Sequence, residues 1–424
     1  MSVDLRAMGA RARAAGRQLS LLSTAARNAA LERMAQVLEA PNAELRAANE
    51  ADLADAHAAA LAPALLDRLT LTPKRITGMA AGCREVAASP DPLNELMDAR
   101  TLPNGLRIAK RRVPLGVLGV IFESRPNVTA EIGALCVKTG NAVIMRGGKE
   151  SLRTNTVLAE LIRGALVECS APADAVQLIT DTDRALVTEL LALDDVLDLV
   201  IPRGGSGLQA MVREHARMPV IYGGIGVCHL FVDATADVAK SVEIVHNAKT
   251  QAPSVCNALD TILVHRAVLD AFVPQAAARL IADDVTLYCD APSLATLRAR
   301  PELPLDRICA AGPEHYGLEF LSLALSVKVV DSLDEAIAHI ARYSTNHSDG
   351  ILTNDYANAT AFCDRVDSAA VYVNASTRFT DGGQFGLGAE VAISTQRLHA
   401  RGPMGIKELT TYKWIVQGDW HVRP

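Results

Sequence analysis

The sequence predicts an α/β protein built around two parallel sheets, each covered by helices. Between residues 115 and 222, short continuous apolar runs such as "LGVLGVIF" and "AVIMRGG" alternate with stretches of helical periodicity. A strand that is apolar along its whole length is buried on both faces, as in βαβ units. The same alternation resumes at "CHLFVD" (228–233), so we expect a second α/β block within the 424 residues.

Local signals predict the individual elements. A helix is expected to begin after Thr72 as N-cap, with Pro73 in its first turn, and to end at the "SPDP" of residues 89–92. The "PNG" of residues 103–105 predicts a β-hairpin with Asn104 and Gly105 at its turn. Further strands are expected in "AVQLI", "LDLVIPRGG", "PVIYGG", "DTILVH", "SVKVVD", "DGILTND" and "AVYVNAS". The C-terminal "IKELTTYKWIVQGDW" is aromatic in a chain with 4% aromatic residues, so we expect a partner subunit to cover it.

Composition argues against several classes of protein. The chain has 42 basic and 48 acidic residues, a net charge of −6, which does not favour nucleic-acid binding. The N-terminal stretch is not continuously apolar and no long uncharged apolar run occurs, so neither a secretory signal nor a membrane span is expected. Eight cysteines without CxxC spacing predict no disulfide framework and fit a reducing cytoplasm. Without an HExxH motif or a cysteine cluster, no metal site is expected.

Cys256, in "TQAPSVCNA" (250–258), is the candidate nucleophile. A single cysteine is usually a small buried apolar residue. The cysteines in helical or strand patterns fit that interpretation: Cys136, Cys169, Cys228, Cys289 and Cys363. Cys256 instead precedes an apolar strand in a loop, where the backbone is held and the side chain can face a cleft. A thiolate that attacks a carbonyl forms a thiohemiacetal or thioester, and both exchange hydride with a nicotinamide. Core packing and catalysis both stay open for this residue.

Two glycine-rich turns follow predicted strands and suit an anionic ligand. In "IPRGGSG" (201–207), Gly204, Gly205 and Ser206 let a backbone approach a phosphate at a helix N-terminus, although such turns are common. In "MRGGK" (145–149), Arg146 and Lys149 flank two glycines and would suit a ribose 2′-phosphate. A solvated basic turn is the alternative for the second stretch.

The stretch "FESRPNVTAEIG" (122–133) leads from a predicted strand into a helix. Asn127 would donate to an oxyanion, and Arg125 would hold a carboxylate or a phosphate. The alternatives are a helix-capping Asn and a surface Arg. His229, His265 and His339 fall in apolar runs and are expected to be core residues.

The order of these segments resembles the aldehyde dehydrogenase superfamily. "VPLGVLGVIFESRPNVT", "QAPSVCNA" and "STQRLHARGPMGIKELTTYKW" carry the resemblance most specifically, and it covers essentially the whole chain. It implies an NADP-binding domain at 1–96 and 113–225 and a catalytic domain at 226–395. A small β oligomerisation element would consist of 97–112 and 396–424, so a homo-oligomer is expected.

The resemblance also implies roles for single residues. Cys256 is the nucleophile, its oxyanion is held by its own N–H and by Asn127 or Asn257, and Arg125 and Arg378 contact the anionic groups of the substrate. NADP(H) is expected on these residues: Arg146, Gly148, Lys149, Gly204, Gly205, Ser206, Gly223, Gly224 and, near the nicotinamide ribose, Glu319 in "GLEFLSLALS". The Gly-Gly-Lys that follows Arg146 favours NADP over NAD.

One departure from the common pattern predicts which acyl acceptor the enzyme uses. Ile221 in "VIYGG" occupies the position where common members carry a glutamate that activates water. An aliphatic side chain cannot be a general base, so phosphate competes for the thioester. The resemblance implies that this reaction is the NADPH-dependent reduction of L-glutamyl 5-phosphate to L-glutamate 5-semialdehyde, the second step of proline biosynthesis, with substrate from a separate glutamate 5-kinase. The alternatives are a CoA-acylating aldehyde dehydrogenase and a non-enzymatic NADP-binding scaffold.

Overall fold

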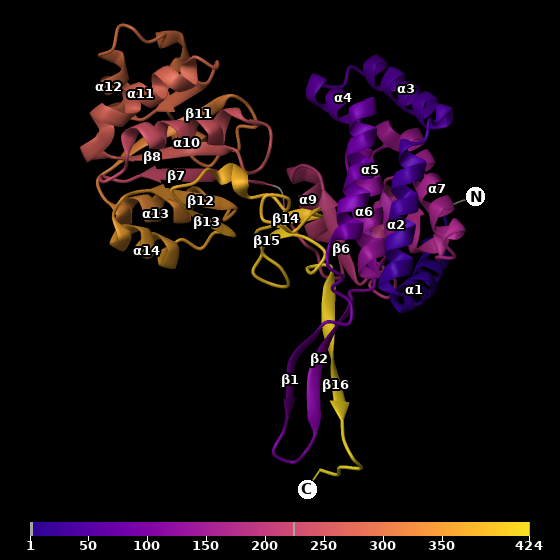
Figure 1. Cartoon of the computed structure of the whole chain (residues 1–424). Coiled ribbons are helices and arrows are strands. Elements are labelled where there is room, and N and C mark those ends of the chain that lie inside the picture. The colour runs from indigo at the N-terminus through magenta and orange to yellow at the C-terminus, as the bar shows by residue number, and fades with distance from the viewer. Residues whose placement is uncertain (1–2, 224, 424) are drawn as a thin grey trace. The chain divides into compact units, whose positions relative to one another are not determined.

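The computed structural model describes residues 3–223 and 225–423, without the side chains of Pro63, Ala64 and Ser206. The chain divides into two compact units (Figure 1). The first comprises Met1–Tyr222, Gly386–Ala392 and Met404–Pro424, and the second comprises Gly223–Phe385 and Ile393–Pro403. The division after Tyr222 lies close to the boundary expected after residue 225, whereas Gly386–Ala392 belongs to the first unit.

The first unit is built on a four-stranded parallel sheet in the order β5-β4-β3-β6. These strands are β3 (Val117–Phe122), β4 (Ala142–Arg146), β5 (Val176–Leu178) and β6 (Leu199–Arg203). Every residue of β3 and β4 is buried, as their apolar runs predict. The helices are α1 (Leu5–Leu21), α2 (Thr24–Glu39), α3 (Ala43–Ala58), α4 (Pro63–Leu69), α5 (Pro73–Ala88), α6 (Asn127–Thr139), α7 (Leu152–Glu168), α8 (Ala185–Leu191) and α9 (Ser206–His215).

The start and the end predicted for the helix after Thr72 are confirmed in this unit. The side chain of Thr72 accepts a hydrogen bond from the N–H of Arg75 at the start of α5, which ends at Ala88 before the prolines. Gly140 closes α6 in the left-handed conformation with φ of 70°, which costs glycine no steric strain. Each of these residues lies directly at the start or the end of its helix, so the sequence alone reveals the signal.

The prediction of a strand in "PVIYGG" is wrong. Residues 219–221 lie alongside the edge strand β6 but form only an isolated bridge between Val200 and Val220. Val200 donates to Pro219 O and accepts from the N–H of Ile221, each over 2.9 Å. Pro219 has no N–H to extend the ladder on one side of the bridge and Pro202 has none on the other side, so pairing stops after one bridge.

The second unit contains a seven-stranded parallel sheet in the order β10-β9-β11-β8-β7-β12-β13. Its strands are β7 (Cys228–Val232), β8 (Leu259–His265), β9 (Thr286–Cys289), β10 (Ile308–Ala310), β11 (Ala324–Val330), β12 (Ser348–Leu352) and β13 (Ala370–Val373). Its helices are α10 (Val238–Thr250), α11 (Leu269–Ile281), α12 (Ala291–Arg298), α13 (Leu333–Tyr343) and α14 (Tyr356–Arg365). On β7, Leu230 packs in the core with α10–α12, and its neighbour Phe231 packs with α13 and α14 on the other face.

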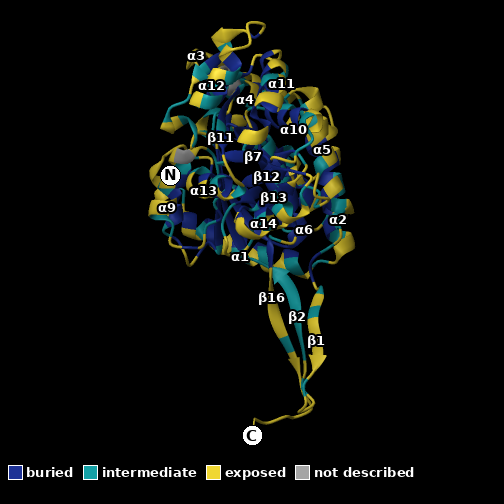
Figure 2. Ribbon diagram, turned by 90° about the vertical axis from the view of Figure 1, so that its left-hand side faces the viewer, coloured by how far each residue is buried: buried dark blue, intermediate teal, exposed yellow. Residues whose placement is uncertain are grey.

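A separate three-stranded antiparallel ribbon belongs to the first unit (Figure 1). The hairpin β1 (Leu96–Thr101) and β2 (Arg107–Pro114) turns at Asn104 and Gly105, as predicted, and β16 (Thr410–Gln417) pairs with β2. Apart from buried Thr410 at the start of β16, the ribbon has the colours of intermediate and exposed residues in Figure 2, whereas β7 and β12 are buried. The remaining strands, β14 (Ala392–Ser394) and β15 (Gly402–Met404), form a two-stranded sheet. Of the helices that the structure describes, none has the length and hydropathy to cross a membrane.

Candidate active site

Cys256 lies in a turn between α10 and β8, at the amino end of the central strands of the second unit. The residue is half-buried, and the N–H of Ala258 donates to Val255 O over 3.1 Å to close the turn. A cysteine in a closed turn keeps a fixed backbone while its thiol stays reachable. This combination suits a nucleophile better than core packing does.

Two residues at the start of β7 hold the backbone of Cys256. Gly226 packs so closely that a Cβ on it would lie 1.6 Å from the carbonyl oxygen of Cys256. The Sγ of buried Cys228 donates to the same oxygen over 3.3 Å. Burial raises the pKa of Cys228 well above its ordinary value, so this thiol stays protonated and able to donate.

Asn257 connects the nucleophile turn to the segment that carries Arg378. Its Nδ2 donates to Thr380 O over 2.9 Å and to Arg378 O over 3.4 Å, and its own carbonyl oxygen accepts from Thr377 Oγ1 over 2.7 Å. Both amide hydrogens are thus already donated to backbone carbonyls. Donation to an oxyanion would require Asn257 to give up one of these bonds.

The guanidinium group of Arg378 is close enough to Cys256 for their charges to interact. Its Nε donates to Gln251 Oε1 over 2.8 Å. Burial lowers the pKa of Arg378, and the charge of a nearby Cys256 thiolate opposes this shift. The structure therefore brings three of the residues expected from the sequence together in one unit: Cys256, Asn257 and Arg378.

Glu319 also reaches this turn. Its Oε1 accepts from the N–H of Gly226 over 2.9 Å, and burial raises the pKa of its carboxyl group. Gly223 pairs with Ser394, and a Cβ on it would lie 2.1 Å from Ile393 O, so close packing explains this glycine. Gly224 lies outside the described residues.

In the first unit, the expected cofactor residues lie at the carboxyl ends of β4 and β6, the two neighbours of β3 in the sheet. Two carboxylates join these ends. Glu123 accepts from the N–H of Gly205 over 3.0 Å, and Glu150 accepts from the N–H of Ser124 over 2.7 Å. Parallel sheets bind nucleotides at this edge. The side chain of Ser206, at the start of α9, lies outside the described residues.

This edge suits the phosphates of a dinucleotide. The N–H of Gly205 already binds an anionic group, the Glu123 carboxylate, and nothing lies within 4 Å of where a Gly205 Cβ would be. Arg146 is buried and donates to Gly147 O and Thr182 O, while its buried Nε has no partner among the described residues. Burial lowers the pKa of Arg146. Lys149 is exposed beside Gly148, whose added Cβ would meet the Glu150 carboxylate at 2.0 Å.

Asn127 and Arg125 lie at the entry to α6. The Nδ2 of Asn127 donates to Glu131 Oε1 over 2.7 Å, which uses one of its two amide hydrogens. The carbonyl oxygen of Arg125 accepts from the N–H of Val128 over 3.0 Å. Asn127 is the first residue of the helix and not its N-cap, so the capping alternative is wrong.

Cys83, Cys136 and Cys289 are buried and are therefore poor nucleophiles. Burial raises the pKa of Cys83 and of Cys289 to about 12 and also raises that of Cys136. Cys363 is exposed on α14, so the prediction that it packs in the core is wrong. Within the described ranges, no group of three His, Cys, Asp or Glu side chains could hold a metal ion.

Two α/β units, one with glycine-rich turns at the carboxyl edge of its sheet and one with a cysteine in a held turn, fit the class of nicotinamide-dependent oxidoreductases. The model of the aldehyde dehydrogenase family matches residues 2–285, and the chain belongs to this family. The predicted fold class is thereby confirmed, and the family implies a nicotinamide cofactor.

Relatives of high sequence identity show which members of this family the chain is similar to. A protein of Roseiflexus castenholzii named gamma-glutamyl phosphate reductase is 57% identical over 422 residues, with 99% of each chain covered. One of the same name from Escherichia coli O1:K1 is 52% identical, with 99% of this chain and 100% of that protein covered. The crystal structure of the Thermotoga maritima gamma-glutamyl phosphate reductase is 44% identical, with a TM-score of 0.95 and full coverage of both chains. An acetylating aldehyde dehydrogenase of Geobacillus thermoglucosidasius shares the fold at 16% identity, with 99% of this chain and 97% of that chain covered and a TM-score of 0.68.

Proposed function

We propose that this chain reduces L-glutamyl 5-phosphate to L-glutamate 5-semialdehyde and phosphate with NADPH, as the second step of proline biosynthesis. The observation that carries the proposal is the held Cys256 turn beside Arg378, in a chain 57% and 52% identical over its length to gamma-glutamyl phosphate reductases.

The residues around Cys256 support thioester chemistry. The Cys256 thiolate attacks the γ-carbonyl carbon, the carbon–sulfur bond forms, and the bond to the phosphate oxygen breaks. The backbone N–H of Cys256 and the second amide hydrogen of Asn127 are the proposed oxyanion donors, because both hydrogens of Asn257 are engaged. When bound, NADPH supplies the hydride. Departure of the aldehyde restores the Cys256 thiolate.

We assign basic residues to the anionic groups of the substrate and of NADPH. Arg378 and Arg125 are proposed to bind the substrate phosphate and α-carboxylate. Arg146 and Lys149, with Gly148 between them, would hold the 2′-phosphate of NADPH, and the turn at Gly204 and Gly205 would hold the pyrophosphate. Glu319 is proposed to contact the nicotinamide ribose.

Ile221 supports phosphate over water as the acyl acceptor in the reverse direction. It is 2% exposed, and its backbone N–H is bonded to Val200 O, so its side chain contributes only apolar surface. Without a carboxylate at this position, water is not activated and the thioester persists until phosphate attacks.

The test runs the reaction in reverse with L-glutamate 5-semialdehyde, NADP and phosphate. We expect NADPH formation only when all three are present, with CoA unable to replace phosphate and NAD a poorer acceptor than NADP. NADPH formation without phosphate would identify a hydrolytic dehydrogenase, and CoA-dependent formation would identify the acylating class.

We also propose that the ribbon of β1, β2 and β16 is the self-association surface. The strand β16 exposes Tyr412, Trp414 and Val416 on alternate positions, each between 47% and 58% exposed. Exposed aromatic side chains on an edge strand favour pairing with another chain.

Trp414→Lys is therefore expected to convert the oligomer to a smaller species, because a charged side chain opposes burial at the centre of β16. Size-exclusion chromatography with light scattering measures the change. The matched control is Leu21→Lys, which alters an 86% exposed apolar residue outside the ribbon and should leave the assembly intact. An unchanged mass for Trp414→Lys would contradict the proposal.

Two further assignments complete the proposed setting. A separate glutamate 5-kinase would supply the labile acyl phosphate. The cytoplasm would keep the Cys256 thiol reduced, in agreement with eight cysteines that form no disulfide.

A further inference from the structure

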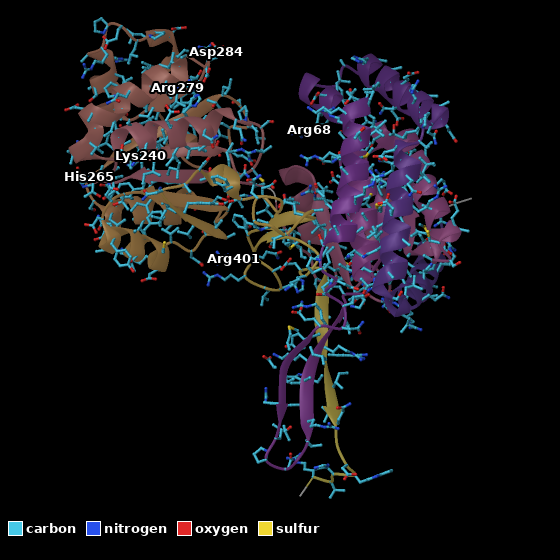
Figure 3. The ribbon with its side chains drawn as sticks, viewed as in Figure 1. Arg68, Lys240, His265, Arg279, Asp284 and Arg401 are labelled. Atoms are coloured by element: carbon cyan, nitrogen blue, oxygen red, sulfur yellow. The ribbon has the colours of Figure 1, made fainter. Side chains whose placement is uncertain are left out.

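Lys249 and Asp260 form a buried ion pair in the second unit. Lys249, near the end of α10, and Asp260, on β8, have side chains 0% and 2% exposed, and Nζ lies 3.4 Å from Oδ1. Asp233 and Asp349 of this unit are buried as well, whereas Lys240, Arg279 and Asp284 lie at its surface (Figure 3). Replacing a buried ion pair by apolar residues is often neutral or stabilising, so stability alone does not account for this pair.

Asp260 holds a second segment besides Lys249. The N–H of Phe320 donates to Asp260 Oδ1 over 3.2 Å, and the Lys249 ammonium lies 5.7 Å from the centre of the Phe320 ring. Burial raises the pKa of Asp260 to about 6, while Lys249 and the N–H groups of Phe320 and Cys228 lower it. The carboxylate thus binds α10, the residue after Glu319 and the start of β7 at one point.

The segment held by Asp260 leads directly to the nucleophile. Phe320 follows Glu319, whose carboxylate accepts from the N–H of Gly226 over 2.9 Å. Gly226 packs on the carbonyl oxygen of Cys256. A displacement of the Asp260 side chain would therefore move Phe320, Glu319 and Gly226 in turn, and Gly226 contacts Cys256. All of these residues lie in one unit.

We propose that Lys249 and Asp260 are positioning residues that hold Glu319 against Gly226 behind the nucleophile Cys256. The proposal rests on the proposed function, in which Glu319 contacts the nicotinamide ribose. Asp260 is assigned no contact with substrate or cofactor, and its effect on the cofactor runs through Glu319. Its contact with the N–H of Cys228 is a second, separate link to the Cys256 turn. Arg378 is held separately by Asn257, so the pair affects the cofactor and leaves phosphate binding unchanged.

A double-mutant cycle in the full chain tests this action through Glu319. In the reverse assay, Asp260→Ala should lower kcat/KM for NADP about tenfold, as expected for a small displacement of a binding group, with KM for phosphate unchanged. In a Glu319→Ala background the same substitution should have no further effect, because the residue through which it acts is gone. Asp260→Asn, which keeps one acceptor oxygen for Phe320, should retain part of the activity and serves if Asp260→Ala fails to fold.

The control is Asp91→Ala, which breaks the buried ion pair of Arg27 and Asp91 in the first unit. Its effect should add to that of Glu319→Ala, and thermal unfolding reports the stability lost by each variant. The rate of Cys256 alkylation by iodoacetamide, measured over the same cycle, needs no turnover and separates failure of this inference from failure of the proposed function. Additive effects of Asp260→Ala and Glu319→Ala on kcat/KM for NADP would overturn the inference.

Discussion

Cys256→Ala is expected to abolish turnover while the protein stays folded. The substitution removes the atom that forms the carbon–sulfur bond. Cys228, which contacts this turn, is buried with a raised pKa and cannot replace it. Loss of a catalytic nucleophile lowers kcat by roughly 10⁴-fold or more. The Cys256 side chain is only half-buried, so its removal leaves no large cavity in the core.

Reverse-direction assays and thermal unfolding check this result together. Cys363→Ala is the control, because it removes an exposed thiol on α14 and should change neither activity nor stability. In the unaltered chain, iodoacetamide should label Cys256 ahead of buried Cys83, Cys136 and Cys289, and substrate should slow that labelling. Cys256→Ala with substantial remaining turnover would refute thioester chemistry.

The sequence predicts most of the fold because the decisive signals are local. Apolar runs, caps and turn residues act over a few positions, so the long strands, α5 and the hairpin at Asn104 and Gly105 are found where expected. The sequence does not reveal the four-residue strand β9, between α11 and α12, because it is too short to show a period. Pairing with its neighbours β10 and β11 decides the conformation of β9, and pairing is not written in the segment itself.

The site is less predictable because its contacts are long-range. Asn257 attracts attention through its place next to Cys256, but its donation to Thr380, 123 residues later, redirects its amide away from the oxyanion role. Nothing in the sequence marks Glu123 as a site residue, yet its carboxylate accepts a hydrogen bond from the N–H of Gly205. Lys249 and Asp260 look like ordinary surface residues of a helix and a strand until the fold buries both.

Gly226→Ala is expected to damage the active site more than any other single methyl addition near it. The new Cβ would lie 1.6 Å from the carbonyl oxygen of Cys256, 2.6 Å from its carbonyl carbon and 3.1 Å from its Cα. All three are backbone atoms that cannot rotate away, so the turn or the start of β7 must move. Gly226 is not among the residues with positive φ, which makes the clash, and not backbone strain, the cause.

The expected cost is about 1–3 kcal/mol of unfolding free energy, the range for overpacking a close contact. A displacement of the nucleophile by about 1 Å lowers kcat roughly 100-fold. The matched control is Gly164→Ala in the middle of α7, where an added Cβ meets nothing within 4 Å. Alanine should stabilise that helix by about 0.5–1 kcal/mol, because it loses less backbone entropy than glycine on folding.

Denaturant unfolding and reverse-direction kinetics on both variants separate the two effects of a methyl group. Gly164→Ala should unfold at higher denaturant with unchanged kcat, whereas Gly226→Ala should lose both stability and kcat. Alkylation of Cys256 should also change in Gly226→Ala alone, because only this glycine touches the Cys256 backbone. If Gly226→Ala keeps its kcat while losing stability, the position of the Cys256 turn does not depend on Gly226, and the turn is held by Cys228 and Asn257 instead.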